Sequence, residues 1–170
     1  VYHQRYSTNT FPTWSLAQPF RVIAHNGEIN TLKGNKNWME AHEPRMIHAS
    51  YDKDIDDLKP IIDRTASDSA ALDSTIELLV RTKRSLPMAK LMTIPEAFAH
   101  RRDFPKKLKD LYTYANAVME SWDGPAAICG CHDQWAIAGM DRNGLRPLRY
   151  TLTNDFLIAG SETGMVEIEE

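Results

Sequence analysis

The sequence has little cysteine, no long apolar run and no excess of charge of one sign. Its two cysteines, Cys129 and Cys131, are one residue apart, so on a strand both point to one face and a disulfide between them would be strained. This argues against a secreted disulfide scaffold and favours a reducing compartment. No apolar run approaches the ~20 residues that cross a bilayer, so no membrane association is expected.

The charges nearly balance, with 20 lysines and arginines against 23 aspartates and glutamates and a net charge of −3. Such a balance gives no overall attraction to phosphate backbones, so nucleic acid is not an expected partner. With 170 residues, 42% of them hydrophobic, the composition is typical of one soluble domain with its own core. Residues 1–6 resemble the interior of a strand, which predicts a piece of a longer protein.

The middle of the chain carries apolar residues at helical spacing. One stripe follows Ser67 and extends to residue 80, and Ser67 or its neighbour can cap the first turn. Prolines at its two ends delimit a shorter helix over 87–95, and a third helix is predicted from about 105 to 122. Residues 50–60 are rich in aspartate and predict an exposed loop.

After residue 125 the pattern changes to strands. Segments 126–131 and 134–140 flank a predicted hairpin turn at His132-Asp133, and a second hairpin is predicted over 148–160. Because the helices are grouped in the middle and the hairpins at the end, the sequence predicts an α+β fold with a mostly antiparallel sheet. A doubly wound parallel sheet would alternate strands and helices throughout.

The cysteines also raise two chemical possibilities. A zinc site needs four ligands, and the cluster Cys129-Gly-Cys131-His132 has neither the usual spacing nor a second half. A thiol nucleophile needs a base within hydrogen-bond reach, but Cys131 and His132 are strand neighbours whose side chains diverge. Buried structural cysteines are therefore the favoured interpretation, and no metal ligand is predicted.

Three polar segments contain what is needed to hold an amino acid. Arg5 offers a bidentate fork for an α-carboxylate, and Asp68 can accept hydrogen bonds from an α-ammonium. The Asn26 side chain and the Gly27 backbone N–H are donors suited to an oxyanion. Each also has a plain structural account: a surface ion pair, a turn after the apolar run 22–24, and a helix cap.

These segments and several others, in order, resemble the class II glutamine amidotransferase domain of glutamate synthases. The matching motifs are His-Gln-Arg-Tyr-Ser-Thr-Asn-Thr at 3–10, Ala-His-Asn-Gly-Glu-Ile-Asn-Thr at 24–31, Ser-Asp-Ser at 67–69, Ile-Pro-Glu-Ala at 94–97, Trp-Asp-Gly-Pro-Ala-Ala at 122–127 and Asp-Arg-Asn-Gly-Leu-Arg-Pro at 141–147. The resemblance covers nearly the whole chain.

The resemblance implies the fold of N-terminal nucleophile hydrolases, with antiparallel sheets sandwiched between helix layers (αββα). Residues 1–170 would form part of a single type 2 domain without its N-terminal segment. By resemblance, Arg5 binds the α-carboxylate of glutamine and Asp68 its α-amino group. Asn26 and the Gly27 N–H would form the oxyanion hole, and Thr8 would line the glutamine site.

The implied activity is hydrolysis of L-glutamine to glutamate and ammonia, which a synthase domain of the parent chain transfers to 2-oxoglutarate. By resemblance the parent holds FMN and an iron–sulfur cluster, whereas this fragment holds no cofactor. The implied partners are L-glutamine and the other domains of the parent chain. The implied compartment is the cytoplasm, or the plastid stroma in a photosynthetic source.

The nucleophile of that family is an N-terminal cysteine whose own α-amine acts as the base, and residue 1 here is valine. An internal cysteine has no free α-amine beside it, so the fragment alone is expected to be inactive. Two alternatives remain: an amidotransferase-like module that binds an amino acid or a partner domain without catalysis, and a thiol hydrolase that uses Cys129. The electron donor of the parent stays open between ferredoxin and a nicotinamide nucleotide.

Overall fold

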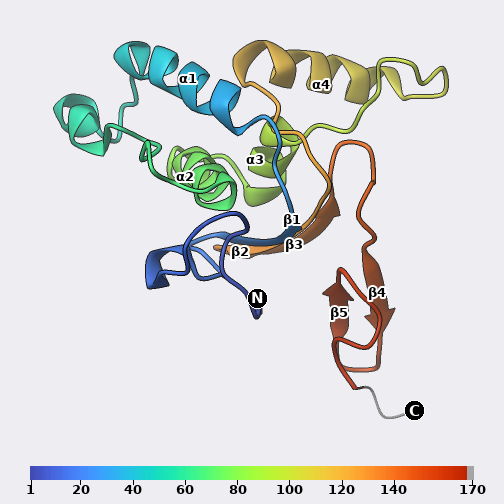
Figure 1. The fold of residues 1–170 in the computed structure, drawn as a ribbon. Coiled ribbons are helices and arrows are strands. Elements are labelled where there is room, and N and C mark those ends of the chain that lie inside the picture. The colour runs from blue at the N-terminus through green and yellow to red at the C-terminus, as the bar shows by residue number, and fades with distance from the viewer. Residues whose placement is uncertain (168–170) are drawn as a thin grey trace.

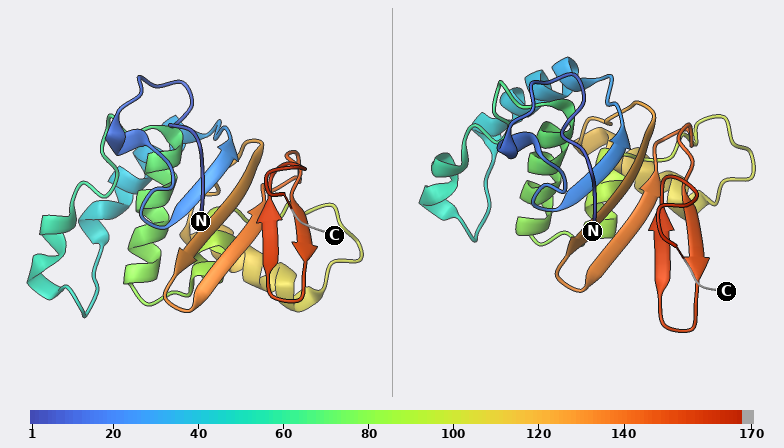
Figure 2. Two further views of the ribbon diagram at one scale, coloured as in Figure 1. Left: turned by 90° about the horizontal axis from the view of Figure 1, so that it is seen from below. Right: turned by 60° about the horizontal axis from the view of Figure 1, so that its bottom comes forward.

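The computed structural model describes residues 1–167, in which a layer of helices covers one face of an antiparallel sheet (Figures 1 and 2). The sheet has the order β1-β2-β3, and a separate antiparallel hairpin joins β4 to β5. The α+β class with antiparallel sheets is therefore confirmed. The strands are β1 (Ile23–Gly27), β2 (Ala126–His132), β3 (Trp135–Met140), β4 (Arg149–Leu152) and β5 (Leu157–Gly160).

The helices form where the apolar spacing predicts them. In Figure 2 the sheet is seen from its open side, with the helices behind it. Within the described part of the chain, no helix is long and apolar enough to cross a membrane. The α-helices are α1 (Leu32–His42), α2 (Asp68–Arg81), α3 (Leu86–Thr93) and α4 (Lys106–Val118), and the 3-10 helices are η1 (Trp14–Leu16), η2 (Glu43–Arg45) and η3 (Asp52–Leu58).

Helix α2 is the centre of the core. The Ser67 hydroxyl accepts a hydrogen bond from the Ala70 N–H at 3.1 Å, which caps the helix as predicted. Leu72 and Ile76, on the predicted apolar stripe, are fully buried between the sheet and the other helices. Trp122, which follows α4, is 1% exposed and packs in the same core, although α4 ends earlier than predicted, at Val118.

A buried carboxylate ties α2 to the start of β1. Asp73 accepts hydrogen bonds from the backbone N–H groups of Arg21, Val22 and Ile23 at 3.2, 3.0 and 2.9 Å. Burial raises the pKa of Asp73, and these three donors lower it only in part. The segment that leads into β1, and Ile23 at its start, are thereby held against the helix layer.

The expected turn at Asn26-Gly27 is wrong. Both residues belong to β1, where Asn26 is paired with Ala127 and Gly27 with Ala126 of β2. The preference of Asn-Gly for turns is local, and here pairing with β2 overrides it because that strand satisfies the backbone of β1 to its last residue.

The end of β1 and the loop before β2 are in close backbone contact. Gly27 has a φ of 140°, and a Cβ atom there would lie 1.9 Å from the carbonyl oxygen of Pro125. Gly124 has a φ of 147°, and its Cβ would lie 2.1 Å from the carbonyl oxygen of Glu28. The N–H of Glu28 donates to the Pro125 carbonyl at 3.0 Å. Only glycine fits at both positions.

Two further expectations need correction. Residues 1–5 form no strand: Tyr6 alone makes a bridge, to Ala17. The reason is that the His3 imidazole, rather than a backbone N–H, contacts the carbonyl oxygen of His25 at 3.1 Å. In the predicted loop 50–60, residues Asp52–Leu58 form the 3-10 helix η3, because backbone carbonyls three residues earlier accept the N–H groups of Asp54 at 2.7 Å and Lys59 at 3.2 Å.

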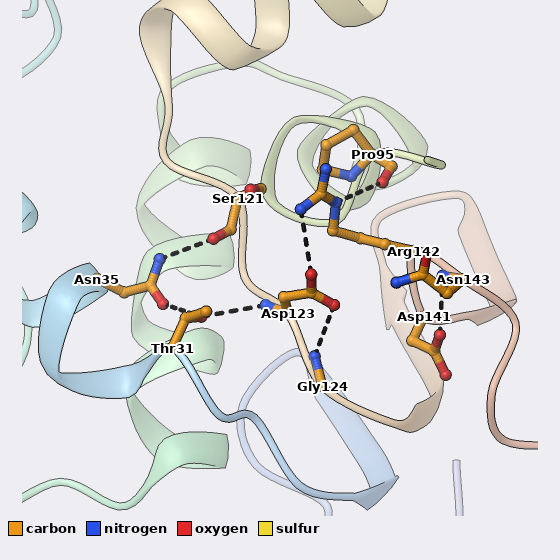
Figure 3. A network of polar contacts seen from close by, with 9 residues as sticks. All are labelled: Thr31, Asn35, Pro95, Ser121, Asp123, Gly124, Asp141, Arg142 and Asn143. Carbon is orange, nitrogen blue, oxygen red and sulfur yellow. Dashed lines mark hydrogen bonds and ion pairs between the residues drawn. The ribbon is translucent and has the colours of Figure 1, made fainter. Parts of the chain in front are cut away.

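A polar network fastens the 121–124 loop to its neighbours (Figure 3). The Asp123 carboxylate accepts hydrogen bonds from the Gly124 N–H at 2.9 Å and from the Arg142 guanidinium at 3.2 Å. Thr31, at the start of α1, accepts a hydrogen bond from the Asp123 N–H at 3.1 Å. Asn35 of α1 donates to the carbonyl of Ser121 at 3.1 Å. The loop that presses on β1 is thus held from both sides.

Replacing Gly124 by alanine should lower the free energy of unfolding by about 2–4 kcal/mol, because the added methyl group meets the Glu28 carbonyl and the backbone is strained. The matched control is Gly34→Ala, where a Cβ meets nothing within 4 Å inside α1. That change should stabilise by up to about 1 kcal/mol. Thermal denaturation compares the two, and equal melting temperatures would contradict the close contact.

Candidate active site

A cavity of about 800 Å³ opens at the end of β1. Its walls come from three parts of the chain that are distant in sequence: residues 2–8, the last residues of β1 at 25–27, and the loop at 161–165 that follows β5. Gln18 completes the lining, and its side-chain oxygen accepts a hydrogen bond from the His25 backbone N–H at 2.8 Å. The walls combine polar and apolar surface, with several side chains able to form hydrogen bonds with a polar ligand.

Arg5 and Thr8 both line this cavity. The irregular segment that carries them is fixed by backbone hydrogen bonds, from the Ser7 N–H to Leu16 at 2.8 Å and from the Gln18 N–H to Arg5 at 3.1 Å. Arg5 is exposed and forms no ion pair with any residue in 1–167. Its guanidinium is therefore available for an anionic group.

Asn26 and Gly27 line the cavity from β1. The Asn26 amide nitrogen donates to the Ser161 hydroxyl at 3.0 Å and to a Glu162 carboxylate oxygen at 3.1 Å. These contacts join the end of β1 to the loop after β5. Gly27 presents bare backbone to the cavity, since its conformation admits no side chain.

Asp68 does not line the cavity. It is the first residue of α2 and 9% exposed, and its carboxylate accepts the N–H groups of Ile29 at 2.9 Å and Ser69 at 2.7 Å. The Ser69 hydroxyl donates to the same carboxylate at 3.0 Å and also shares a hydrogen bond with the His25 imidazole. Asp68 thus lies behind His25, one residue removed from the cavity wall.

His25 is a cavity residue that the sequence analysis did not single out. It is 3% exposed, and burial lowers the pKa of its imidazole; the nearby Asp68 raises that pKa, whereas the nearby Arg146 guanidinium lowers it further. The ring is therefore neutral at pH 7, and its Nδ1 atom has no partner within residues 1–167. In the sequence, only its position directly before Asn26 indicates that His25 belongs to the site.

Ser161 and Glu162 were also missed. They follow β5, and nothing in their local sequence indicates a contact with Asn26, which lies 135 positions before Ser161 and 136 before Glu162. Neither cysteine lines the cavity. Cys129 is paired with Ala24 inside the sheet, and burial raises the pKa of its thiol, so it carries less thiolate than a free cysteine.

Comparison with known proteins gives the family. The sequence pattern of Glutamine amidotransferases class-II matches residues 1–170. The chain belongs to this family. The chain is 57% identical over 171 residues to the glutamate synthase [NADPH] large chain of Azospirillum brasilense, a match covering 100% of this chain and 11% of that protein.

Other relatives of the amidotransferase are also glutamate synthases. It is 50% identical to the glutamate synthase [NADH] of Saccharomyces cerevisiae, with 98% of this chain and 8% of that protein covered. It is 46% identical to the ferredoxin-dependent glutamate synthase of Pyropia yezoensis, with 99% and 11% covered. The chain spans about a tenth of the length of these curated relatives.

A second buried carboxylate holds the other end of the site. Asp141, directly after β3, accepts the N–H groups of Ala126 at 2.9 Å, Asn143 at 3.0 Å, and Leu145 and Arg146 at 3.1 Å. Burial by itself would raise the pKa of Asp141, but these backbone donors outweigh it and lower the pKa. Asp141 thereby fixes the start of β2, opposite Gly27, and the turn that carries Arg146.

Replacing Asp141 by asparagine should lower the free energy of unfolding by about 1–2 kcal/mol at pH 7, because charge-assisted hydrogen bonds are lost. Since the folded-state pKa lies below its ordinary value of 3.8, the contribution is complete above that value and is lost as the pH falls through the folded-state pKa. Melting temperatures of both proteins between pH 3 and 7 should therefore converge only at the acid end.

The control is Asp155→Asn, whose carboxylate is exposed and accepts no hydrogen bond in the structure as described. This change should alter stability by less than about 0.5 kcal/mol at every pH. A difference between wild type and Asp141→Asn that stays constant down to pH 3 would contradict the assigned role of the carboxylate.

Proposed function

We propose that residues 1–170 are part of the glutaminase domain of a glutamate synthase, which hydrolyses L-glutamine to glutamate and ammonia. The observation that carries the proposal is the single cavity lined by Arg5, Thr8, Asn26 and Gly27. Those are four of the five side chains or backbone groups implied by the family motifs. Relatives up to 57% identical that bear the name glutamate synthase support the choice of parent enzyme.

In this proposal the cavity holds glutamine by its head group and its side-chain amide. The unpaired Arg5 guanidinium takes the α-carboxylate in a bidentate geometry, and Thr8 contacts the substrate beside it. The Asn26 amide and the Gly27 N–H stabilise the negative oxygen that develops when the side-chain amide is attacked. Such donors act most strongly when they are positioned before the reaction, and β1 is fixed by β2 on one side and by Asp73 at its start.

Asp68 is proposed to bind the α-ammonium group. Its carboxylate already accepts N–H groups from Ile29 and Ser69, but a carboxylate has about four acceptor positions and so retains capacity. Asp68 lies behind His25, so its carboxylate reaches the ammonium only if the His25 side chain moves aside. Alternatively, Asp68 acts indirectly, through its hydrogen bond with the Ser69 hydroxyl. The neutral imidazole of His25 adds no positive charge that would repel the ammonium.

The reaction also needs a thiol. The thiolate attacks the side-chain carbonyl carbon, ammonia leaves after protonation, and water hydrolyses the γ-glutamyl thioester to glutamate. Neither Cys129 nor Cys131 lines the cavity. We propose that the nucleophile is an N-terminal cysteine outside residues 1–170, with its own α-amine as the base, so that these residues alone bind glutamine without turning it over.

The remaining proposals concern the parent protein. Ammonia would pass to a synthase domain and react there with 2-oxoglutarate, with FMN and an iron–sulfur cluster as cofactors. An iron–sulfur cluster takes four cysteine thiolates as a rule, and this chain has two cysteines, so such a cluster does not fit here. The names of the relatives include NADPH, NADH and ferredoxin as donors, and one relative is chloroplastic. A cytoplasmic or plastid location is proposed accordingly.

Replacing Asn26 by alanine in the complete encoded protein should lower kcat for ammonia release from glutamine by about a hundredfold or more, the usual effect of losing an oxyanion donor. The matched control is Asn116→Ala, an exposed asparagine of α4 outside the cavity, which should leave kcat unchanged. Cys129→Ser should also retain activity. An unchanged rate in Asn26→Ala would remove this residue from the mechanism, and loss in Cys129→Ser would favour an internal thiol hydrolase.

The same protein distinguishes catalysis from binding alone. Isothermal titration with L-glutamine should show binding that is weakened in Arg5→Ala, together with ammonia release in the wild type. Binding without ammonia release from the complete protein would instead identify an amidotransferase-like module that only recognises an amino acid.

A further inference from the structure

We propose that Glu162 is a positioning residue that orients the Asn26 amide toward the oxyanion, with Arg146 offsetting its negative charge. The inference rests on the proposed glutaminase function and adds to it a residue outside every motif that identified the site. It starts from the contact between the Asn26 nitrogen and the loop after β5, where a Ser161 hydroxyl lies at 3.0 Å and a Glu162 oxygen at 3.1 Å.

The amide nitrogen of Asn26 has two hydrogens and, in this structure, two acceptors from the loop. One hydrogen must be released before the amide can donate to an oxyanion. The two acceptors differ in strength, because hydrogen bonds to a carboxylate are about twice as strong as those between neutral groups. The Asn26 hydrogen that Ser161 accepts is therefore the one that turns to the developing oxyanion. The other amide hydrogen stays hydrogen-bonded to Glu162.

Retention by Glu162 fixes the plane of the amide. With one hydrogen held by Glu162, the second points toward Ser161, which itself lines the cavity, so an oxyanion bound there competes with Ser161 for it. Asn26 lies on β1, whose backbone is already fixed by pairing with β2, so the side-chain torsion is the freedom that remains. Catalysis by an oxyanion donor depends on its orientation before charge develops, and the contact with Glu162 supplies that orientation.

A carboxylate next to an oxyanion would oppose catalysis unless its charge were offset. The Arg146 guanidinium lies 3.7 Å from the same Glu162 oxygen. The backbone of Arg146 is held by Asp141, whose carboxylate accepts the Arg146 N–H at 3.1 Å. The chain of contacts Asp141, Arg146, Glu162 and Asn26 thus joins the turn after β3 to the oxyanion donor. Because the Glu162 side chain is 62% exposed, solvent screens the charge and the effect should be moderate.

The test measures glutaminase kinetics of the complete encoded protein. Glu162→Ala should lower kcat about tenfold with the KM for glutamine changed less than twofold, because the orientation of the amide and not the binding of the head group is lost. Glu162→Gln keeps an acceptor oxygen and should recover kcat to within about threefold of wild type. Ser161→Ala should cost less than Glu162→Ala.

A double-mutant cycle tests whether Glu162 acts through Asn26. In the Asn26→Ala background, Glu162→Ala should lower kcat by less than a further twofold, since the group that it orients is absent. Glu40→Ala is the matched control: Glu40 is also an exposed glutamate paired with an arginine, Arg64, but it lies on α1 outside the cavity. This variant should have wild-type kinetics.

The outcomes separate the inference from the proposed function. A wild-type protein without glutaminase activity rejects the proposed function, and the inference falls with it. An active wild type that is sensitive to Asn26→Ala but has unchanged kcat in Glu162→Ala rejects the inference alone. Equal losses in Ser161→Ala and Glu162→Ala also overturn it, because the carboxylate acceptor would then have no special role. A Glu162→Gln variant as impaired as Glu162→Ala overturns it as well, because an acceptor oxygen at this position would then not restore the orientation of the amide.

Discussion

The close backbone contact between the end of β1 and the loop before β2 is the constraint on which the site depends. Gly27 lies so close to the Pro125 carbonyl oxygen that no side chain fits there. Gly124 lies about as close to the carbonyl oxygen of Glu28. The contact fixes where β1 ends, and so where the Asn26 amide and the Gly27 N–H enter the cavity. Two glycines therefore determine the geometry of the groups that we propose as oxyanion donors.

Buried carboxylates extend this constraint into the rest of the fold. Asp73 holds the first residues of β1 through three backbone donors, and Asp141 holds the start of β2 and the turn that follows β3. Both are satisfied almost entirely by backbone N–H groups, which makes their burial tolerable and fixes the chain next to the two ends of the β1–β2 pairing. The polar network around Asp123 does the same for the loop between α4 and β2 (Figure 3).

Function in this family member is consequently distributed over segments that meet only in the folded chain. The groups that line the cavity are carried by an irregular N-terminal segment, by the end of a strand and by the loop after β5. The proposed role of Glu162 fits that arrangement, since it joins the last of these segments to the first strand. The β4–β5 hairpin returns the loop at 161–165 to the end of β1.

The sequence by itself determined the features that depend on neighbours along the chain. The helices after Ser67 formed near the predicted positions, although α4 ends at Val118, because helical hydrogen bonds are local. The family motifs indicated Arg5 and Asn26, which the fold brings to one cavity, and Asp68, which lies outside it. Tertiary structure decided the rest. In the folded chain Asn26-Gly27 is part of a paired strand, and Asp68 lies behind His25. A Glu162 oxygen lies 3.1 Å from the amide nitrogen of Asn26, 136 positions earlier in the sequence. No local pattern encodes these contacts, because each depends on which backbone groups another segment leaves free to pair.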